Sequence, residues 1–457
     1  MNRTTVIVAL CLLAAGAGAQ WLETTIELPD SSWPNALLYN PTSNKVYCSN
    51  FAVGSVSVID GATNAVIATI PTPAQPAYFC HNSQDNKVYC THYDSGKISV
   101  IDGVTDTIIR TVNAGNQANG ICYNAANNRV YVIHFAAESV QVLDGAGDTL
   151  IAAAPVGDAP RSLLYNPSYN KVYCSNINSD NVTVIDGATN AVIATVPTGD
   201  APRLMCHNGR DDKVYVANHN NDSITVIDGA TNAVIATVPA GDYPRGVAYN
   251  AWYNKVYCSN KGSNDVTVID GATNAVLATV PADTAPFGIL SNDINDKVYC
   301  SSSGGNDVTV IDAAADSVIT TIACGAYASE MVHNPFQNRV YVLNMDEWTV
   351  SVIRDSIPVG IEETMSDAPF DGGRRGRRGT TTRPPTVVRG VLFLPERASS
   401  SASTSCLLDI SGRKVMDLAP GANDVRSLAP GVYFCRLTAG SASSARPSAV
   451  TKVVIQE

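Results

Sequence analysis

The sequence predicts an all-β fold made of eight similar sheets, and three observations carry this prediction. The first is a unit of 42 residues that repeats eight times without insertion or deletion. The tyrosine of its Val-Tyr pair stands at Tyr47, Tyr89, Tyr131, Tyr173, Tyr215, Tyr257, Tyr299 and Tyr341. A fixed period of this size indicates a repeat architecture. The other two observations are four short apolar runs in each full unit, and a segment near the N-terminus that supplies the run missing from the last unit.

The runs within a unit have the pattern of β-strands. In the fourth unit they span residues 162–165, 171–175, 182–185 and 191–196, each bounded by turn residues. The Asp-Gly-Ala-Thr-Asn stretch between the last two runs suits a hairpin, because Gly and Asn tolerate positive φ. The first run is apolar on consecutive residues and is expected to be covered on both faces. Four antiparallel strands with the innermost one buried describe a blade of a β-propeller.

The ends of the series predict a closed ring. Residues 24–29 match in phase residues 66–71, the fourth run of the first full unit. The eighth unit ends with a run near Val350 and lacks a fourth. An open solenoid, the alternative, would need capping repeats at both ends. The first strand is therefore expected to complete the last of eight four-stranded blades, in a propeller domain of residues 20–356.

Charge and the first residues indicate an exported protein that does not bind nucleic acid. The formal net charge is −11, whereas phosphate binding needs a basic surface. Arg3, the apolar residues 6–15 and an Ala-Gly-Ala sequence before Gln20 are typical of a secretory signal peptide, expected over residues 1–19. No later stretch reaches the roughly 20 apolar residues of a membrane span. We expect a secreted or cell-surface location, with a mature chain from about Gln20 and no transmembrane segment.

Most of the twelve cysteines are expected to be small buried hydrophobic residues. Cys48, Cys90 and Cys174 share one phase of the unit with Val132 and Val216, and a position that alternates between Cys and Val packs in a core. No cysteine or histidine spacing typical of a metal site occurs, so neither a metal nor a cofactor is expected. Most histidines share phases with Tyr or Asn, and the Val-Ile-Asp aspartates lie in turns. We select no catalytic residue.

One set of candidate binding residues lies in the connections that enter the innermost strands. Three consecutive units carry Gly-Asp-Ala-Pro-Arg or Gly-Asp-Tyr-Pro-Arg there, which supplies Asp158, Asp200, Asp242, Arg161, Arg203 and Arg245. In a propeller these connections ring one mouth of the central channel, so the arginines are expected to form an arc, followed by Phe287 and Ser329. Arginine forks suit carboxylate or phosphate, and a small anion or acidic sugar is the expected ligand. The alternative is that each arginine pairs with an aspartate of the same rim.

A second candidate set is the loop that follows the Tyr-Cys-Ser-Asn position of each unit. These loops differ most from unit to unit, and the last one, residues 345–348, ends in Trp348. We expect them on the same face as the arginine arc. Variable loops on a rigid scaffold are where partners usually bind, so Trp348 is included among the candidate ligand-binding residues.

The repeat itself resembles a known family. Tyr215-Val-Ala-Asn218 and Tyr341-Val-Leu-Asn344, with the Val-Ile-Asp-Gly-Ala-Thr-Asn-Ala-Val-Ile-Ala-Thr-Val-Pro pattern, are similar to the YVTN family of β-propeller repeats. The resemblance covers residues 23 to about 354. Members of that family include surface-layer and other exported proteins, mostly without assigned chemistry. The resemblance therefore implies a location rather than an activity.

Two further segments follow the repeats. Residues 357–385 are rich in Arg, Gly, Thr and Pro and are expected to be a linker. Its arginines make a contact with anionic polysaccharide or lipid the alternative to a solvated spacer. Residues 386–457 regain strand patterning, and residues 408–415 and 428–437 resemble the C-terminal sorting domain of type IX secretion. A small β-sandwich is expected, with Cys406 and Cys435 as disulfide candidates. The family's Asn-Pro-Phe-Asn opening is absent, so a related non-sorting module is the alternative.

Together these features predict an exported, non-enzymatic propeller that binds an extracellular ligand or partner, with a C-terminal domain that directs secretion or attachment. The ligand classes considered are a glycan, a small anion and a protein, and the secretion machinery is the expected partner of the C-terminal domain. Near-identical units leave little room for the unlike converging groups that an enzyme needs. The alternatives are a propeller enzyme, of the lactonase or quinoprotein dehydrogenase kind that this fold resembles, and a purely structural envelope protein.

Overall fold

The computed structural model describes residues 20–355, apart from Asn116 and Asp293, and the backbone of seven strands between residues 386 and 455. The predicted signal peptide, residues 1–19, and the predicted linker, residues 357–385, lie outside the described residues. Among the described residues there is no helix with the length and apolarity required to cross a bilayer.

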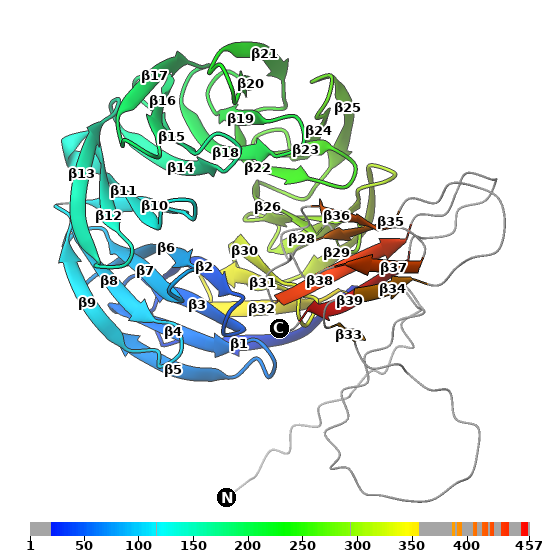
Figure 1. Ribbon diagram of the computed structural model, residues 1–457, viewed down its shortest axis with the longest axis horizontal. Coiled ribbons are helices and arrows are strands. Elements are labelled where there is room, and N and C mark those ends of the chain that lie inside the picture. The colour runs from blue at the N-terminus through cyan, green and yellow to red at the C-terminus, as the bar shows by residue number, and fades with distance from the viewer. Residues whose placement is uncertain are drawn as a thin grey trace, which may run out of the picture.

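Eight four-stranded antiparallel sheets stand around a central axis, as the period predicts (Figure 1). The innermost strands contact one another around the ring. They are β2 (Pro34–Asn40), β6 (Pro76–Asn82), β10 (Ala118–Asn124), β14 (Pro160–Asn166), β18 (Pro202–Asn208), β22 (Pro244–Asn250), β26 (Pro286–Asn292) and β30 (Ala328–Asn334). The second strands are β3 (Lys45–Asn50), β7 (Lys87–His92), β11 (Arg129–His134), β15 (Lys171–Asn176), β19 (Lys213–Asn218), β23 (Lys255–Asn260), β27 (Lys297–Ser302) and β31 (Arg339–Asn344).

The two outer strands of each blade complete the sheets. The third strands are β4 (Ser55–Asp60), β8 (Lys97–Asp102), β12 (Ser139–Asp144), β16 (Asn181–Asp186), β20 (Ser223–Asp228), β24 (Asp265–Asp270), β28 (Asp307–Asp312) and β32 (Thr349–Arg354). The outermost are β5 (Val66–Pro71), β9 (Ile108–Asn113), β13 (Thr149–Pro155), β17 (Val192–Pro197), β21 (Val234–Pro239), β25 (Val276–Pro281), β29 (Ser317–Ala323) and β1 (Trp21–Glu27). A short 3₁₀ turn, η1 (Phe135–Ala137), precedes β12.

The N-terminal strand closes the ring, which confirms the prediction. The eighth sheet has the order β1-β32-β31-β30, and β1 runs antiparallel to β32 with Trp21 opposite Arg354 and Glu27 opposite Thr349. The innermost strands β30 and β2 are in contact across the seam. The last blade therefore acquires its fourth strand from the start of the domain, which covers the edge that β32 would otherwise expose.

The repeated tyrosines hold neighbouring blades together. All eight are fully buried. The Tyr215 hydroxyl donates to the side-chain oxygen of Asn274 in the next blade at 2.8 Å. The Lys213 ammonium donates to the Gly271 carbonyl of the same turn at 2.7 Å. Across the seam, the Tyr341 hydroxyl donates to Asn64 at 2.7 Å, so the last interface has the contact that Tyr215 makes.

The Val-Ile-Asp aspartates and most repeat histidines are structural, as their phases predict. Asp228 accepts hydrogen bonds at 2.7 Å from both the backbone N–H and the hydroxyl of Thr231, which closes the hairpin turn. His207 lies 2.8 Å from Asp212. In the next blade, Tyr249 donates to the equivalent Asn254 at 3.0 Å. A histidine at this phase thus makes the contact that a tyrosine makes elsewhere.

The cysteines of the propeller are free thiols in blade interiors, in agreement with the core-packing prediction. Cys122 and Cys324 are partly buried, and the other seven described cysteines are buried. Burial in an apolar environment raises the pKa of these thiols, for Cys122 to about 12. Because the thiolate is the reactive form, these cysteines are chemically inert.

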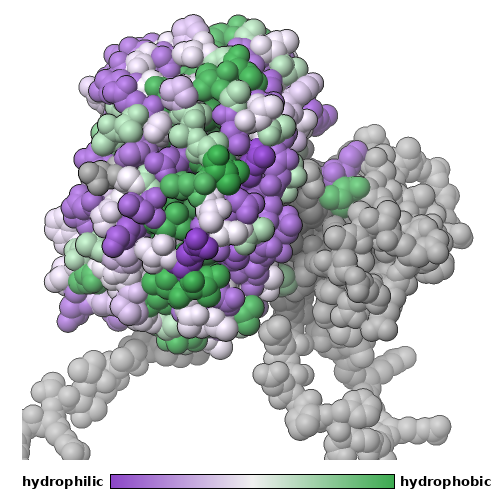
Figure 2. Space-filling model, turned by 60° about the vertical axis from the view of Figure 1, so that its left-hand side comes forward, coloured by the Kyte–Doolittle hydropathy of each residue, from purple (hydrophilic) through white to green (hydrophobic). Residues whose placement is uncertain are grey.

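The outer strands present pairs of apolar side chains to the surface. Figure 2 shows hydrophobic groups separated by polar ones on the side of the propeller. At one phase of the outermost strand, seven blades expose a large aliphatic residue: Ile67, Ile109, Ile151, Ile193, Ile235, Leu277 and Ile319. The eighth blade has Thr25 of β1 at that phase.

The strands between residues 386 and 455 form two sheets, in line with the all-β prediction for this region. One sheet has the order β33-β39-β38-β35-β36 and the other pairs β34 with β37. The strands are β33 (Thr386–Val388), β34 (Val391–Leu394), β35 (Ser405–Leu408), β36 (Lys414–Leu418), β37 (Gly421–Asp424), β38 (Gly431–Leu437) and β39 (Ala449–Ile455). In the register of β35 and β38, Cys406 stands opposite Arg436 and Cys435 opposite Leu407. The side chains of both cysteines lie outside the described residues, and their disulfide stays a prediction.

Candidate ligand-binding site

A β-bulge turns the candidate arginines toward the channel. In β18, Pro202 pairs with Asn218, and the next paired residue is Met205, so Arg203 lies in a stretch where the register with β19 shifts. The same shift places Arg245 in the bulge of β22. A bulge breaks the strict alternation of a strand and re-aims its side chains. The residues that follow the Gly-Asp-x-Pro sequence can therefore point along the channel axis instead of into a blade interface.

Serines of neighbouring blades fix the bulged backbone. The Ser175 hydroxyl of β15 donates to the Arg203 carbonyl at 2.7 Å. The Ser259 hydroxyl of β23 donates to the Phe287 carbonyl at 3.1 Å and accepts the Gly246 N–H at 3.0 Å. These hydrogen bonds link one blade to the next at the level of the candidate site. The backbone of Arg203 is thus held by the neighbouring blade, and that of Gly246, which follows Arg245, is held within its own blade.

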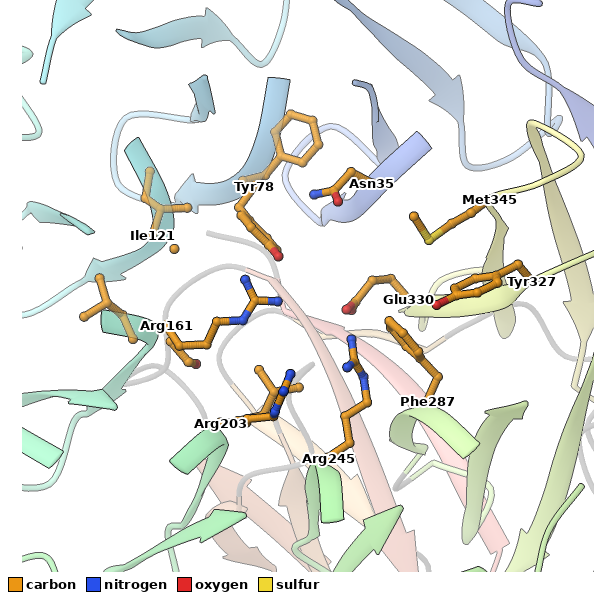
Figure 3. Close-up of a pocket in the computed structure, with 15 residues that line it drawn as sticks. Asn35, Tyr78, Ile121, Arg161, Arg203, Arg245, Phe287, Tyr327, Glu330 and Met345 are labelled. Carbon is orange, nitrogen blue, oxygen red and sulfur yellow. The ribbon is translucent and has the colours of Figure 1, made fainter. Parts of the chain in front are cut away.

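The bulges of successive blades surround a cavity of about 400 Å³ at the channel mouth. Arg161, Arg203 and Arg245 line it from β14, β18 and β22, and Figure 3 shows their guanidinium groups directed toward its centre. The connections that enter the innermost strands predict this arc. Tyr78 and Glu330 face the arginines from the other side of the cavity (Figure 3). The volume lies within the roughly 300–1,000 Å³ range of small-molecule sites.

The three arginines do not pair with the rim aspartates, so that alternative is wrong. Within residues 20–355, none of the three forms an ion pair. The exposed Asp158 instead accepts a hydrogen bond from the side chain of Asn178 at 3.1 Å. The Nε atoms of Arg203 and Arg245 are buried without a hydrogen-bond partner. The cavity thus contains guanidinium groups whose hydrogen-bonding capacity is not used by the protein.

Burial and mutual repulsion act on these arginines together. Burial lowers the pKa of the Arg245 guanidinium, and Glu330 opposes that shift. Burial and then the charge of Arg161 lower the pKa of Arg203. Arg245 lies over the ring of Phe287, with 3.5 Å between its guanidinium carbon and the ring centroid. All three remain charged, because an arginine does not lose its proton in a protein.

Glu330 is the charged residue of the cavity that sequence reasoning missed. Burial raises the pKa of its carboxyl group, while Arg245 and Arg161 act in the opposite direction. A signal was present, because this phase of the unit carries no other charge: its other residues are Ala36, Tyr78, Gly120, Ser162, Leu204, Gly246 and Gly288. A comparison of every phase for a single charged exception would have found it.

The remaining candidates lie outside the cavity lining. Asp158, Asp200 and Asp242 are exposed on the rim, where the Asn220 and Ser263 side chains contact the latter two. Trp348 has φ 55°, and its carbonyl accepts the Leu28 N–H at 3.1 Å, so its backbone belongs to the seam with β1.

The variable loops do lie on the predicted face. The His219 N–H donates to the Ala201 carbonyl at 3.1 Å, which joins a variable loop to the connection before β18. The Met345 N–H likewise donates to the Tyr327 carbonyl at 3.2 Å. Met345 and Tyr327 both line the cavity. In the eighth blade, the loop therefore takes part in the candidate site through its first residue.

Comparison with known proteins identifies the fold only. No protein-family model matches the chain, and no curated protein matches it. Among solved structures, dihydro-heme d1 dehydrogenase NirN in complex with DHE aligns with a TM-score of 0.61 at 15% identity, over 73% of this chain and 75% of that one. Hydrazine synthase of Kuenenia stuttgartiensis aligns with a TM-score of 0.51 at 19% identity, over 62% of this chain and 96% of that one. What is shared is the propeller.

Proposed function

We propose that this protein is an exported, non-enzymatic propeller that binds a small anionic ligand at the mouth of its central channel. The observation that carries the proposal is the convergence of Arg161, Arg203 and Arg245 on one cavity without an ion-pair partner within residues 20–355. All three are partly buried, and charges that are withdrawn from water are normally paired or bound to a ligand. The lining carries three guanidinium groups and one carboxyl group, which leaves an excess of positive charge.

The chemistry of the lining supports an anion rather than a neutral apolar molecule. A guanidinium group binds carboxylate or phosphate through two parallel hydrogen bonds, which gives both strength and orientation. The guanidinium groups of Arg161, Arg203 and Arg245 line the cavity and form no ion pair within residues 20–355, so they can supply donors of this kind. Three guanidinium groups in one cavity repel one another, and a purely structural role leaves the cost of that repulsion without a reason. This argues for a binding protein over a structural envelope protein.

The export part of the proposal rests on the sequence. The apolar N-terminal segment, the resemblance to YVTN repeats and the resemblance of residues 386–457 to a type IX sorting domain support a secreted or surface-displayed propeller. Deletion of residues 386–457 should leave the propeller in the periplasm, as measured by cell fractionation with antibody detection. Arrival of the truncated chain at the cell surface would contradict the sorting role and leave the binding proposal intact.

Titration calorimetry with inorganic phosphate and with cyclohexanecarboxylate tests anion binding directly. Each of Arg161→Gln, Arg203→Gln and Arg245→Gln should weaken binding about tenfold, because a hydrogen bond to a charged group contributes roughly 1.5–3 kcal/mol. Arg210→Gln is the matched control, since Arg210 is exposed and does not line the cavity. Failure of the wild-type protein to bind either anion at low salt, or equal loss in the Arg210 variant, would refute the proposal.

A further inference from the structure

We infer that the ligand is an acidic sugar, a uronic-acid unit whose carboxylate lies between Arg161 and Arg203 and whose ring hydroxyls donate to Glu330. The inference rests on the proposed anion-binding function and specifies its ligand class. It follows from the unequal distribution of charge in the cavity, from the presence of a carboxyl group among arginines, and from the aromatic side chains of the lining.

Arg203, which feels the charge of Arg161, is the cavity arginine with the least compensation. Arg245 is stacked on Phe287 at 3.5 Å, and Glu330 is the main charge that favours its protonated form. Within residues 20–355, no carboxylate acts on Arg203 in this way. The charge that affects its pKa is the like charge of Arg161. The ring of Tyr78 lies 6.0 Å from the Arg161 guanidinium carbon, which is a weak contact. One anionic group between Arg161 and Arg203 would relieve the repulsion between them.

Glu330 determines which chemical group the ligand can place opposite its carboxylate end. A carboxylate in an anion site repels an anionic ligand unless it receives hydrogen bonds from that ligand, because an ionised carboxylate can only accept. The facing ligand group must therefore be a donor. An ammonium group is disfavoured, since Arg161 and Arg245 both act on the Glu330 carboxyl and would repel a further cation. Neutral hydroxyl groups meet the requirement, and a sugar acid carries several of them beside its carboxylate.

The aromatic side chains suit a sugar ring. Tyr78 and Tyr327 line the cavity, and Figure 3 shows Tyr327 beside Glu330 and Tyr78 beside Arg161. Phe287 lies at 5.9 Å from Tyr327 in an edge-to-face arrangement, and its face is covered by Arg245. Tyrosine offers an apolar face together with a polar hydroxyl. Such a wall matches a pyranose, which has an apolar C–H face and a polar rim.

Calorimetry with two ligands of similar shape separates this inference from the proposed function. Glucuronate and cyclohexanecarboxylate both carry one carboxylate on a six-membered ring, and only glucuronate has hydroxyl groups. The full chain should bind glucuronate at least tenfold more tightly than cyclohexanecarboxylate, and should bind neutral glucose more weakly than either. Equal affinity for the two acids would overturn the sugar assignment while the anion site stands. Loss of all anion binding, phosphate included, would overturn the proposed function itself.

The substitution Glu330→Gln gives a test with opposite signs for the two acids. Glucuronate should bind about tenfold more weakly, because charge-assisted hydrogen bonds are replaced by neutral ones. Cyclohexanecarboxylate should bind more tightly, because a repelling charge has been removed. A change in the same direction for both ligands would contradict the role of Glu330. If the glutamine variant does not fold, Glu330→Ser serves instead, since Ser162 stands at the same phase of the fourth blade.

Discussion

At the scale of single residues, the carboxyl groups of Asp307 and Asp283 are expected to make the stability of the propeller depend on pH. Asp307 begins β28 and is 5% exposed, and Asp283 lies in the exposed connection after β25. Burial, then the hydrogen bond and charge of Asp283, raise the pKa of Asp307 to about 7. The pKa of Asp283 is lowered, mainly by the hydrogen bond from Asp307. Below about pH 7, Asp307 therefore keeps a proton in the folded protein that it would lose in the unfolded chain.

The sign of this effect follows from the higher pKa in the folded state. Asp307 contributes stability that is fully present below its ordinary pKa of 3.8 and is lost as the pH rises through about 7. The melting temperature should therefore fall between about pH 4 and about pH 7 in the wild-type protein, and Asp307→Asn should reduce this slope. Differential scanning fluorimetry across that range measures it.

Asp265→Asn is the control for the pH experiment. Asp265 stands at the same phase as Asp307 in the preceding blade, but Gly241 replaces the opposing Asp283 there. Its substitution should leave the pH slope as it is. An asparagine is also tolerated at this phase, because Asn181 occupies it in the fourth blade. A slope that persists unchanged in Asp307→Asn would show that other groups determine the pH response.

At the scale of the repeated element, the sequence predicted strands and blades because each recurring residue has the same structural role in every unit. The Val-Tyr pair, the Val-Ile-Asp turn and the alternating Cys and Val positions pack or close turns wherever they occur. Tyr215 and Lys213 both donate to the Gly271 turn of the next blade. Tyr173 and Lys171 donate to Gly229 in the same way, and Tyr341 and Arg339 donate to Gly61. Phase alone therefore identified core and turn residues.

The site was only partly predictable for a physical reason. The arc of Arg161, Arg203 and Arg245 followed from the fold, since the connections to innermost strands meet at the channel. The bulge that follows Pro160 decides whether the Arg161 side chain points toward Asp158 or into the channel. This register shift has no signature in the residue pattern. Trp348 was selected for its loop, yet its backbone conformation ties that position to the seam.

At the scale of the whole molecule, ring closure depends on one blade made from both ends of the domain. Arg339 of β31 makes a bidentate pair with Glu23 of β1, at 2.6 and 2.7 Å. The same guanidinium donates to the carbonyls of Gly61 at 2.9 Å and Ala62 at 2.8 Å in the first blade. Arg339 thus joins the N-terminal strand, the last blade and the first blade. Most other blades have a lysine at this phase.

A conservative substitution of Arg339 should therefore weaken closure specifically. Arg339→Lys retains a donor for the Gly61 and Ala62 carbonyls but loses the planar fork that matches Glu23. Arg129→Lys is the matched control. Arg129 stands at the same phase in the third blade and donates to the Gly187 and Ala188 carbonyls, and it forms no ion pair within residues 20–355.

Hydrogen exchange of the β1 amides reports closure, and the melting temperature reports the whole propeller. Arg339→Lys should speed exchange in Trp21–Glu27 and lower the melting temperature more than Arg129→Lys does, because the pair is partly buried and holds the strand that covers the β32 edge. Glu23→Gln should produce most of the same effect, and the double substitution should be less than additive, since both remove one interaction. Equal effects of the two arginine substitutions, with unchanged exchange in β1, would show that backbone pairing alone closes the ring.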